Sequence, residues 1–102
     1  MFVHTVYYWL NPDSSQIDRA KMIGDAVELL AKVPSVRHLW SGQPAPHGRS
    51  VADSTYHIGL TIVFDDRAGY DLYREHPFHT DFGKRNRRHW HKVKVYDYVA
   101  GV

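Results

Sequence analysis

Tyr73-Arg74-Glu75-His76-Pro77-Phe78-His79 is the most informative stretch of this 102-residue sequence, because it breaks a helical region in two. Proline disfavours helical geometry in the residue that precedes it. The stretch therefore predicts a helix over residues 67–75, a break at His76 and Pro77, and a second helical piece from about residue 78 to residue 88. Tyr73 would lie late in the first piece, and His79 near the start of the second.

The flanking sequence predicts four strands, over residues 2–10, 36–42, 55–64 and 92–99, because these segments are rich in β-branched and aromatic residues. A further helix is expected over residues 15–32, with Asp13 or Ser14 as its cap, Gln16 completing a capping box, and Pro34 after its end. The order β-α-β-β-α-β is the ferredoxin-like arrangement of the α+β class. We expect one domain over residues 1–102.

The spacing of apolar residues in the first helix predicts the face that it buries. The expected core stripe is Ile17, Ala20, Ile23, Val27 and Leu30, and the residues expected to face solvent are Asp18, Lys21, Asp25 and Glu28. The segment 43–53 holds two prolines and a glycine and is expected to be a loop, either a pocket lid or an ordinary surface excursion.

Neither the first nor the third strand has a polar side, although one solvated face would produce alternation. Helices can cover one face of the sheet, and the sheet of a second copy is the simplest cover for the other. The sequence thus predicts a homodimer formed through sheet–sheet packing, a dimeric α/β barrel.

Composition limits the function. The chain has no cysteine, which excludes disulfides, thiolate metal sites and a cysteine nucleophile. No signal-peptide pattern and no apolar run of roughly 18 residues is present, so we expect a cytoplasmic protein without a membrane partner. Eight histidines, three Trp, seven Tyr and four Phe favour a small-molecule pocket, with a small hydrophobic or keto ligand.

Four residues are candidates for chemistry. The positive end of a helix favours a neutral imidazole, so His79 is a candidate general base. The phenol of Tyr73 can donate a hydrogen bond to a developing oxyanion. His4 and His57 lie on strands that are neighbours in a ferredoxin-like sheet, so they are expected close together, facing the helices, with space left by Gly59. The four side chains would line one pocket between the sheet and the helices.

Structural roles compete with each of these assignments. His76 can cap backbone carbonyls, and His4, His57 and His79 can be hydrogen-bonded structural histidines. His76 and His79 have a weak metal-ligand spacing that no acidic residue completes, so no metal is predicted. A basic run near the C-terminus could be a solvated helix face or an anchor for an acidic ligand tail; with a net charge of +2 and no RNA-binding motif, nucleic acid is not expected. The run is Lys84, Arg85, Arg87, Arg88, His89, His91, Lys92 and Lys94.

Nearly the whole chain resembles the stress-responsive A/B barrel (Dabb) family. The His76-Pro77-x-His79 core is the most specific part of the resemblance. The supporting residues are His4, Tyr56-His57-Ile58, Tyr73, Phe82-Gly83, Trp90 and Tyr96-Asp97-Tyr98. The resemblance implies a ferredoxin-like homodimer in which two sheets form a barrel.

Within this family the chain is similar to plant polyketide cyclases, which close a linear polyketide by an intramolecular aldol condensation. This implies a cofactor-free lyase or cyclase with a His base at His79, a Tyr partner at Tyr73, and His4 and His57 lining the substrate pocket. The long 43–53 loop and the bulky Tyr8 and Trp9 could reshape or fill that pocket. The alternatives are a non-catalytic stress-responsive ligand-binding dimer and a cofactor-independent monooxygenase-like barrel.

Overall fold

The computed structural model describes residues 1–101 and has the predicted α+β order. Along the chain, the elements are β1 (Phe2–Leu10), α1 (Gln16–Glu28), the 3-10 turn η1 (Leu30–Lys32), β2 (Val36–Gly42), β3 (Ile58–Phe64), α2 (Arg67–Glu75), α3 (Pro77–Asn86), the 3-10 turn η2 (Arg87–His89) and β4 (Trp90–Val99). The ferredoxin-like fold and the break between α2 and α3 are therefore confirmed. The third strand begins three residues later than predicted, and the fourth two residues earlier.

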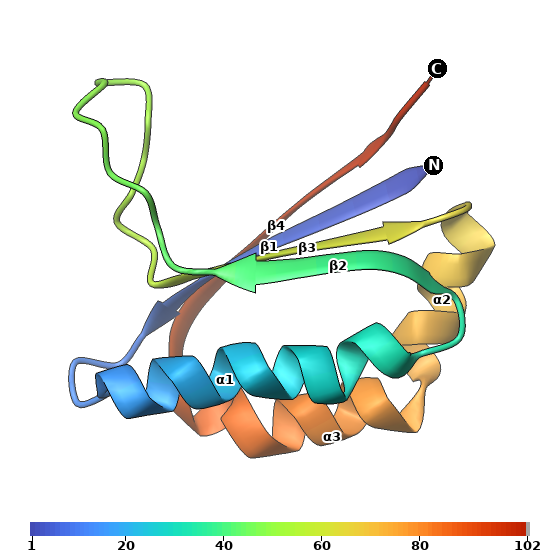
Figure 1. Cartoon of the computed structure of the whole chain (residues 1–102), viewed down its shortest axis with the longest axis horizontal. Helices are drawn as coiled ribbons and strands as arrows, with labels where there is room; N and C mark the ends of the chain where they lie inside the picture. The colour runs from blue at the N-terminus through green and yellow to red at the C-terminus, as the bar shows by residue number, and fades with distance from the viewer. Residues whose placement is uncertain (102) are drawn as a thin grey trace.

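The four strands form one antiparallel sheet in the order β2-β3-β1-β4, so β1 and β3 are central. The helices lie on one side of this sheet (Figure 1). Alternate residues of β1 and β3 point toward them and form the core, with Leu30, Ile62 and Phe64 fully enclosed. The loop between β2 and β3 rises on the side away from the helices (Figure 1).

Helix α1 begins one residue later than its predicted caps would place it. Ser15 is the N-cap: its hydroxyl accepts a hydrogen bond from the Asp18 amide at 3.1 Å, and the Asp18 carboxylate accepts one from the Ser15 amide at 3.0 Å. The predicted cap at Asp13 or Ser14, and the capping box of Asp13 with Gln16, are therefore wrong. The serine box has the same physical origin, since both satisfy amides that have no partner within the helix.

The buried face of α1 also differs from the predicted stripe. Met22, Ala26 and Leu29 are buried, whereas Ile17 is 79% exposed and Val27 55% exposed. Ala20 is exposed as well, and Ile23 is only partly buried. Leu30 belongs to the core, but it belongs to η1 and not to α1. Helix periodicity allowed both faces, and the observed one packs Met22 and Ala26 into the core and turns Asp25 toward α3.

Asp25, predicted to face solvent, is 6% exposed and joins α1 to α3. The side-chain amide of Asn86 donates to its carboxylate at 3.1 Å, and Arg85 lies 3.5 Å from the other carboxylate oxygen. Asn86 also donates to the Phe82 carbonyl at 3.0 Å. A buried carboxylate is tolerated here because both of its oxygens have partners.

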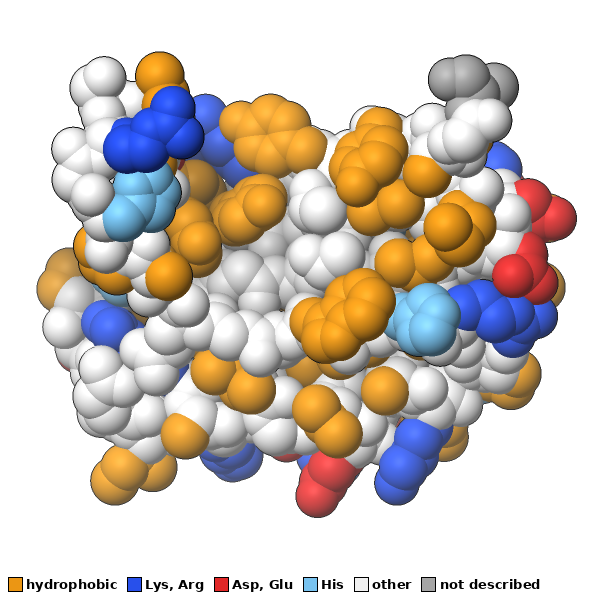
Figure 2. All heavy atoms as spheres, turned by 45° about the horizontal axis from the view of Figure 1, so that its top comes forward, with side chains coloured by type: hydrophobic (Ala, Val, Ile, Leu, Met, Phe, Trp, Pro, Cys, Tyr) orange, Lys and Arg blue, Asp and Glu red, His pale blue; other side chains and the backbone are white. Residues whose placement is uncertain are grey.

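The other face of the sheet, called here the open face, has no helical cover. It presents large side chains of both edge strands: Trp40 is 59% exposed, Tyr96 57% and Tyr98 59%. Figure 2 shows hydrophobic side chains gathered around a hollow on this side of the molecule. None of the helices in residues 1–101 has the length and apolar character of a membrane span.

Candidate active site

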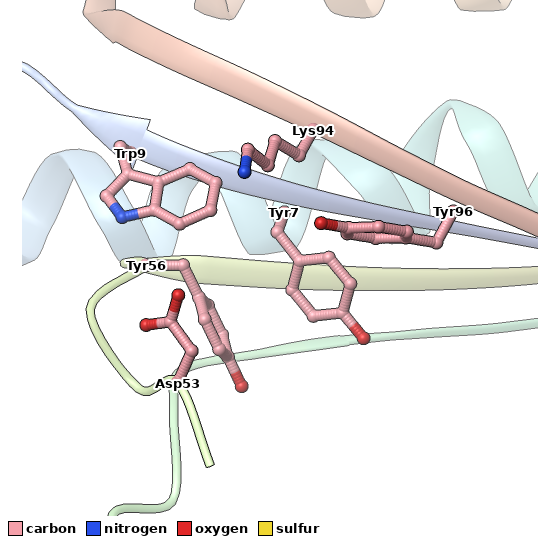
Figure 3. A pocket seen from close by; sticks show the side chains of 6 residues that line it. All are labelled: Tyr7, Trp9, Asp53, Tyr56, Lys94 and Tyr96. Atoms are coloured by element: carbon pink, nitrogen blue, oxygen red, sulfur yellow. The ribbon is translucent and has the colours of Figure 1, made fainter. Parts of the chain in front are cut away.

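A cavity of about 310 Å³, called here the His pocket, lies between the sheet and the helices α2 and α3. His4, Tyr73 and His79, three of the four predicted site residues, line it. Tyr8 forms part of its wall and is 5% exposed, but it does not fill the space. Trp9 points to the open face (Figure 3) and leaves the pocket free.

The break between α2 and α3 brings Tyr73 and His79 together. His76 has extended backbone angles, and Pro77 occupies the first position of α3, where its missing amide hydrogen costs nothing. The His76 ring nitrogen Nδ1 accepts a hydrogen bond from the Phe78 amide at 3.0 Å, so His76 caps an amide and not the carbonyls that were predicted. Across this corner, the rings of Tyr73 and His79 lie 4.8 Å apart between centroids, at 68°.

His4 enters the same pocket from β1. Its Nδ1 lies 2.6 Å from the carboxylate of Asp97, its register partner on β4. Burial lowers the pKa of His4 below 6.5, and the Asp97 carboxylate opposes part of that shift. A neutral His4 therefore donates Nδ1–H to Asp97, which leaves Nε2 unprotonated and able to accept a hydrogen bond.

The electrostatics of the pocket favour a neutral His79 imidazole and a protonated Tyr73 phenol. Burial is the largest cause that lowers the pKa of His79; His4, when protonated, and the charges of Arg74 and Arg87 act in the same direction, and a hydrogen bond with the Arg74 backbone opposes them. Burial raises the pKa of Tyr73, which is 2% exposed, well above its ordinary value of 10.0. At neutral pH the pocket thus presents an imidazole that can accept a proton beside a phenol that can donate a hydrogen bond.

His57 does not join this group, contrary to prediction. His4 pairs with Ile62, but His57 precedes Ile58, which pairs with Tyr8 at the far end of β1. The His57 ring accepts a hydrogen bond from the Leu10 amide at 2.8 Å, a structural contact that holds the end of β1. Gly59 does not open space beside His57: it pairs with Tyr7, and a β-carbon on it would make ordinary contacts with the rings of Tyr56 and Tyr7 at 3.5 and 3.6 Å.

A second cavity, of about 360 Å³, lies on the open face. Figure 3 shows its lining, the side chains of Tyr7, Trp9, Asp53, Tyr56, Lys94 and Tyr96. The indole of Trp9 donates to Thr55 at 3.0 Å, and the hydroxyl of Thr55 hydrogen-bonds to Asp53. These contacts hold the loop on the open face, so it is not a lid over the His pocket.

The basic run of the sequence does not form one patch. Arg85 pairs with Asp25 between the helices, and Arg87 lines the His pocket. Lys92 lies 4.6 Å from the centroid of the Trp9 ring, on the open face, where Lys94 also lies. The strand and the helix simply place neighbours in sequence on different sides of the molecule.

Sequence reasoning did not single out Asp97, which contacts His4, or Arg74, which lines the pocket. Asp97 could have been found from the alternation of side chains along β4, because it lies on the same side of the strand as Val93 and Val95. An acidic side chain on an otherwise apolar side of a strand needs a polar partner. No pattern marked Arg74, whereas Arg87 belongs to the basic run, for which an anchor of an acidic ligand tail was one of the predicted roles. Within residues 1–101, no group of three or more His, Asp or Glu side chains could hold a metal ion.

Comparison with known proteins places these features in context. The family model of the stress responsive A/B barrel domain (Dabb) matches residues 2–100. A Dabb family protein with a ferredoxin-like fold from Mesorhizobium loti is 27% identical, with 96% of this chain and 94% of that chain covered and a TM-score of 0.78. No curated protein sequence matches the chain.

Two further structures share the fold at lower identity. One is a dimeric ferredoxin-like protein of unknown function from Thermobifida fusca, 15% identical over 96% of this chain and 89% of that chain, with a TM-score of 0.82. The other is a hydroxynitrile lyase from Passiflora edulis, 19% identical over 99% of this chain and 88% of that chain, with a TM-score of 0.82. Several structural neighbours are thus dimeric ferredoxin-like proteins.

Proposed function

The chain belongs to the stress responsive A/B barrel domain (Dabb) family, and we propose that it is a cofactor-free lyase or cyclase that removes a proton next to a keto group. The observation that carries the proposal is the convergence of His79, Tyr73 and His4 on one pocket. The lyase from Passiflora edulis has the same fold, but the proposal for this chain rests on these side chains.

In the proposed reaction His79 accepts the proton from the carbon beside the carbonyl group, and the electron pair of that C–H bond moves onto the carbonyl oxygen. Tyr73 donates a hydrogen bond to the resulting enolate oxygen, which lowers the barrier because the donor is already in place. His4, held by Asp97, uses its unprotonated Nε2 to accept a hydrogen bond from a substrate hydroxyl group. His57 has no part in this site.

The enolate carbon then attacks a second carbonyl group, which forms the new carbon–carbon bond. The alkoxide that results takes the proton that His79 has held, so the imidazole returns to its neutral form. No electron leaves the substrate and no co-reactant is consumed. The pocket only has to hold the two reacting carbons close together and exclude water.

The first test is the pH dependence of proton abstraction from 1-phenylpropan-2-one, followed by deuterium exchange in D₂O. The catalytic form is the neutral imidazole, and burial lowers the pKa of His79. The exchange rate should therefore persist below pH 6.5 and be lost only as the pH falls through the depressed pKa. A midpoint above 6.5 would contradict His79 as the base, and binding of keto compounds without exchange would favour a non-catalytic ligand-binding dimer.

The proposal includes a homodimer in which the open faces of two sheets pack together. Trp40, Tyr96 and Tyr98 leave more than half of their surfaces exposed on this one face, a density of large side chains that monomers rarely expose. Neighbours of the same fold are dimers. A second copy covers this face and adds buried area that a domain of this size lacks by itself.

Thr61→Asp is expected to dissociate this dimer. Thr61 lies on the open face of the central strand β3, between Thr5 and Trp40. A carboxylate there would be buried on assembly and would weaken association by about 100-fold or more. Sedimentation velocity should report a monomer with an unchanged circular dichroism spectrum. Ile17→Asp, on the exposed side of α1, is the matched control and should remain dimeric; equal behaviour of the two variants would refute the interface.

A further inference from the structure

We infer that the substrate of the His pocket is an acid, a keto compound whose carboxylate is held by Arg74 and Arg87. This inference rests on the proposed function of the same pocket and names the class of its substrate. It goes beyond the family resemblance, in which no arginine has a role.

The charge of the pocket lining is one-sided. Arg74 and Arg87 line the pocket together with two histidines, and no Asp or Glu side chain is part of the lining. Within residues 1–101, Arg74 and Arg87 have no carboxylate within 4.0 Å, unlike Arg37, Arg67 and Arg85; the other arginines without such a partner do not line the pocket. Two guanidinium groups without a carboxylate partner at one pocket mouth match an anionic ligand.

Gly83 makes room for one of the two arginines. A β-carbon on Gly83 would lie 2.8 Å from a guanidinium nitrogen of Arg87, one helical turn further along. The guanidinium folds back over the surface of α3 because position 83 carries no side chain. Any larger residue there would displace this flexible group from its present position, at little cost to the fold.

The two arginines act on the same imidazole. The positive charges of Arg74 and Arg87 both contribute to the lowered pKa of His79, so each lies within electrostatic range of that ring. Arg74 also lies over the face of Tyr70, 5.8 Å from the ring centroid, which restrains its side chain. An anion held by both groups would therefore sit beside the proposed base.

The wall opposite α3 fits the apolar body of such a ligand. Val93 and Val95 line the pocket and are 41% and 49% exposed, although their partners on β1, Tyr8 and Val6, are 5% and 4% exposed. The helical cover thus ends between β1 and β4, and two valines remain uncovered at the pocket. A keto acid with a flat or aliphatic body would cover them while its carboxylate reaches the arginines.

The test compares 2-naphthoate with its neutral isostere 2-naphthamide by isothermal titration calorimetry on the full chain. We expect the acid to bind about tenfold more tightly than the amide, because a charge-assisted hydrogen bond is lost with the carboxylate. Arg74→Met and Arg87→Met should each remove most of that preference and leave amide binding unchanged. Arg88→Met, at the neighbouring exposed position outside the lining, is the control and should bind like the parent chain.

Gly83→Ala provides a second line of evidence, because it displaces the Arg87 guanidinium and leaves the arginine in place. It should reduce acid binding as Arg87→Met does, without loss of thermal stability. Three results would each overturn the inference. They are equal affinity for acid and amide, no binding of 2-naphthoate at millimolar concentration, and an equal loss of the preference for the acid in Arg88→Met.

The inference and the proposed function fail in different ways. Binding of 2-naphthoate does not need a base, so His79→Ala should retain the preference for the acid. Acid binding that depends on both arginines, without exchange of any ketone proton, would refute the enzyme and leave the acid site standing. Exchange of the ketone proton without tighter binding of the acid would refute the acid site and leave the proposed enzyme standing.

Discussion

His79→Ala is expected to slow deuterium exchange of 1-phenylpropan-2-one by about 10²- to 10⁴-fold, the range that a positioned general base contributes. The imidazole is half-buried, so the variant loses one ring contact with Tyr73 and little else of the core. The measurement is the loss of the α-proton signal by NMR at neutral pH, with the circular dichroism spectrum and the oligomer mass as checks on folding.

Two further variants define what this loss would mean. Tyr73→Phe keeps the ring and removes the hydroxyl group, so it should slow exchange by a smaller factor, because only the oxyanion donor is lost. His47→Ala, on the exposed loop between β2 and β3, should leave the rate unchanged. A His79→Ala variant that exchanges at the parent rate would show that another group, such as His4, is the base.

Asn86→Leu is expected to destabilise the chain by about 3 kcal/mol, because it leaves a buried carboxylate short of a partner. Asn86 is 2% exposed and donates to both Asp25 and the carbonyl of Phe82. Arg85 remains 3.5 Å from Asp25 and offsets part of the loss. Urea denaturation at one fixed protein concentration should show a lower midpoint with an unchanged slope.

The double variant Asp25→Leu with Asn86→Leu is the matched control. Replacing both polar partners by apolar residues removes the unpaired charge, so most of the lost stability should return. A double variant that is no more stable than Asn86→Leu alone would mean that the cost comes from packing and not from the buried carboxylate.

The alternatives to a cyclase predict different results in the same assays. A monooxygenase-like barrel would consume oxygen with a quinol, and His79→Ala would then alter oxygen uptake. A ligand-binding dimer would bind 2-naphthoate through Arg74 and Arg87, and neither ketone exchange nor oxygen uptake would be measurable. The His pocket is common to all three, so the assays separate chemistry from binding.

Much of the fold could be predicted because its causes are local. Pro77 prevents His76 from taking helical angles, so the corner between α2 and α3 follows from two adjacent residues. The same corner places Tyr73 and His79 on either side of one turn, and the structure lines one pocket with both. The strands follow from runs of β-branched and aromatic side chains, whatever lies opposite them.

Two of the incorrect predictions, His57 in the pocket and the buried stripe of α1, concern which distant residues become neighbours. The alternation of side chains along one strand does not predict that His57 lies opposite the end of β1, because register depends on the pairing of two strands far apart in sequence. The spacing of apolar residues in α1 allowed more than one face, and the observed one buries Met22 and Ala26 in the core and places Asp25 against Asn86 of α3. Local preference defines each element, whereas long-range contacts choose its neighbours.

The stretch from Tyr73 to His79 illustrates both the local preferences and the long-range contacts. Its composition was enough to indicate a helix break with a histidine and a tyrosine on either side of it. The other residues of the pocket come from elements that no local pattern linked to this stretch. His4 and Asp97 come from β1 and β4, and Arg87 lies against Gly83, which has no side chain. Backbone conformation is settled within a few residues, but a pocket forms only where packing brings separate elements together.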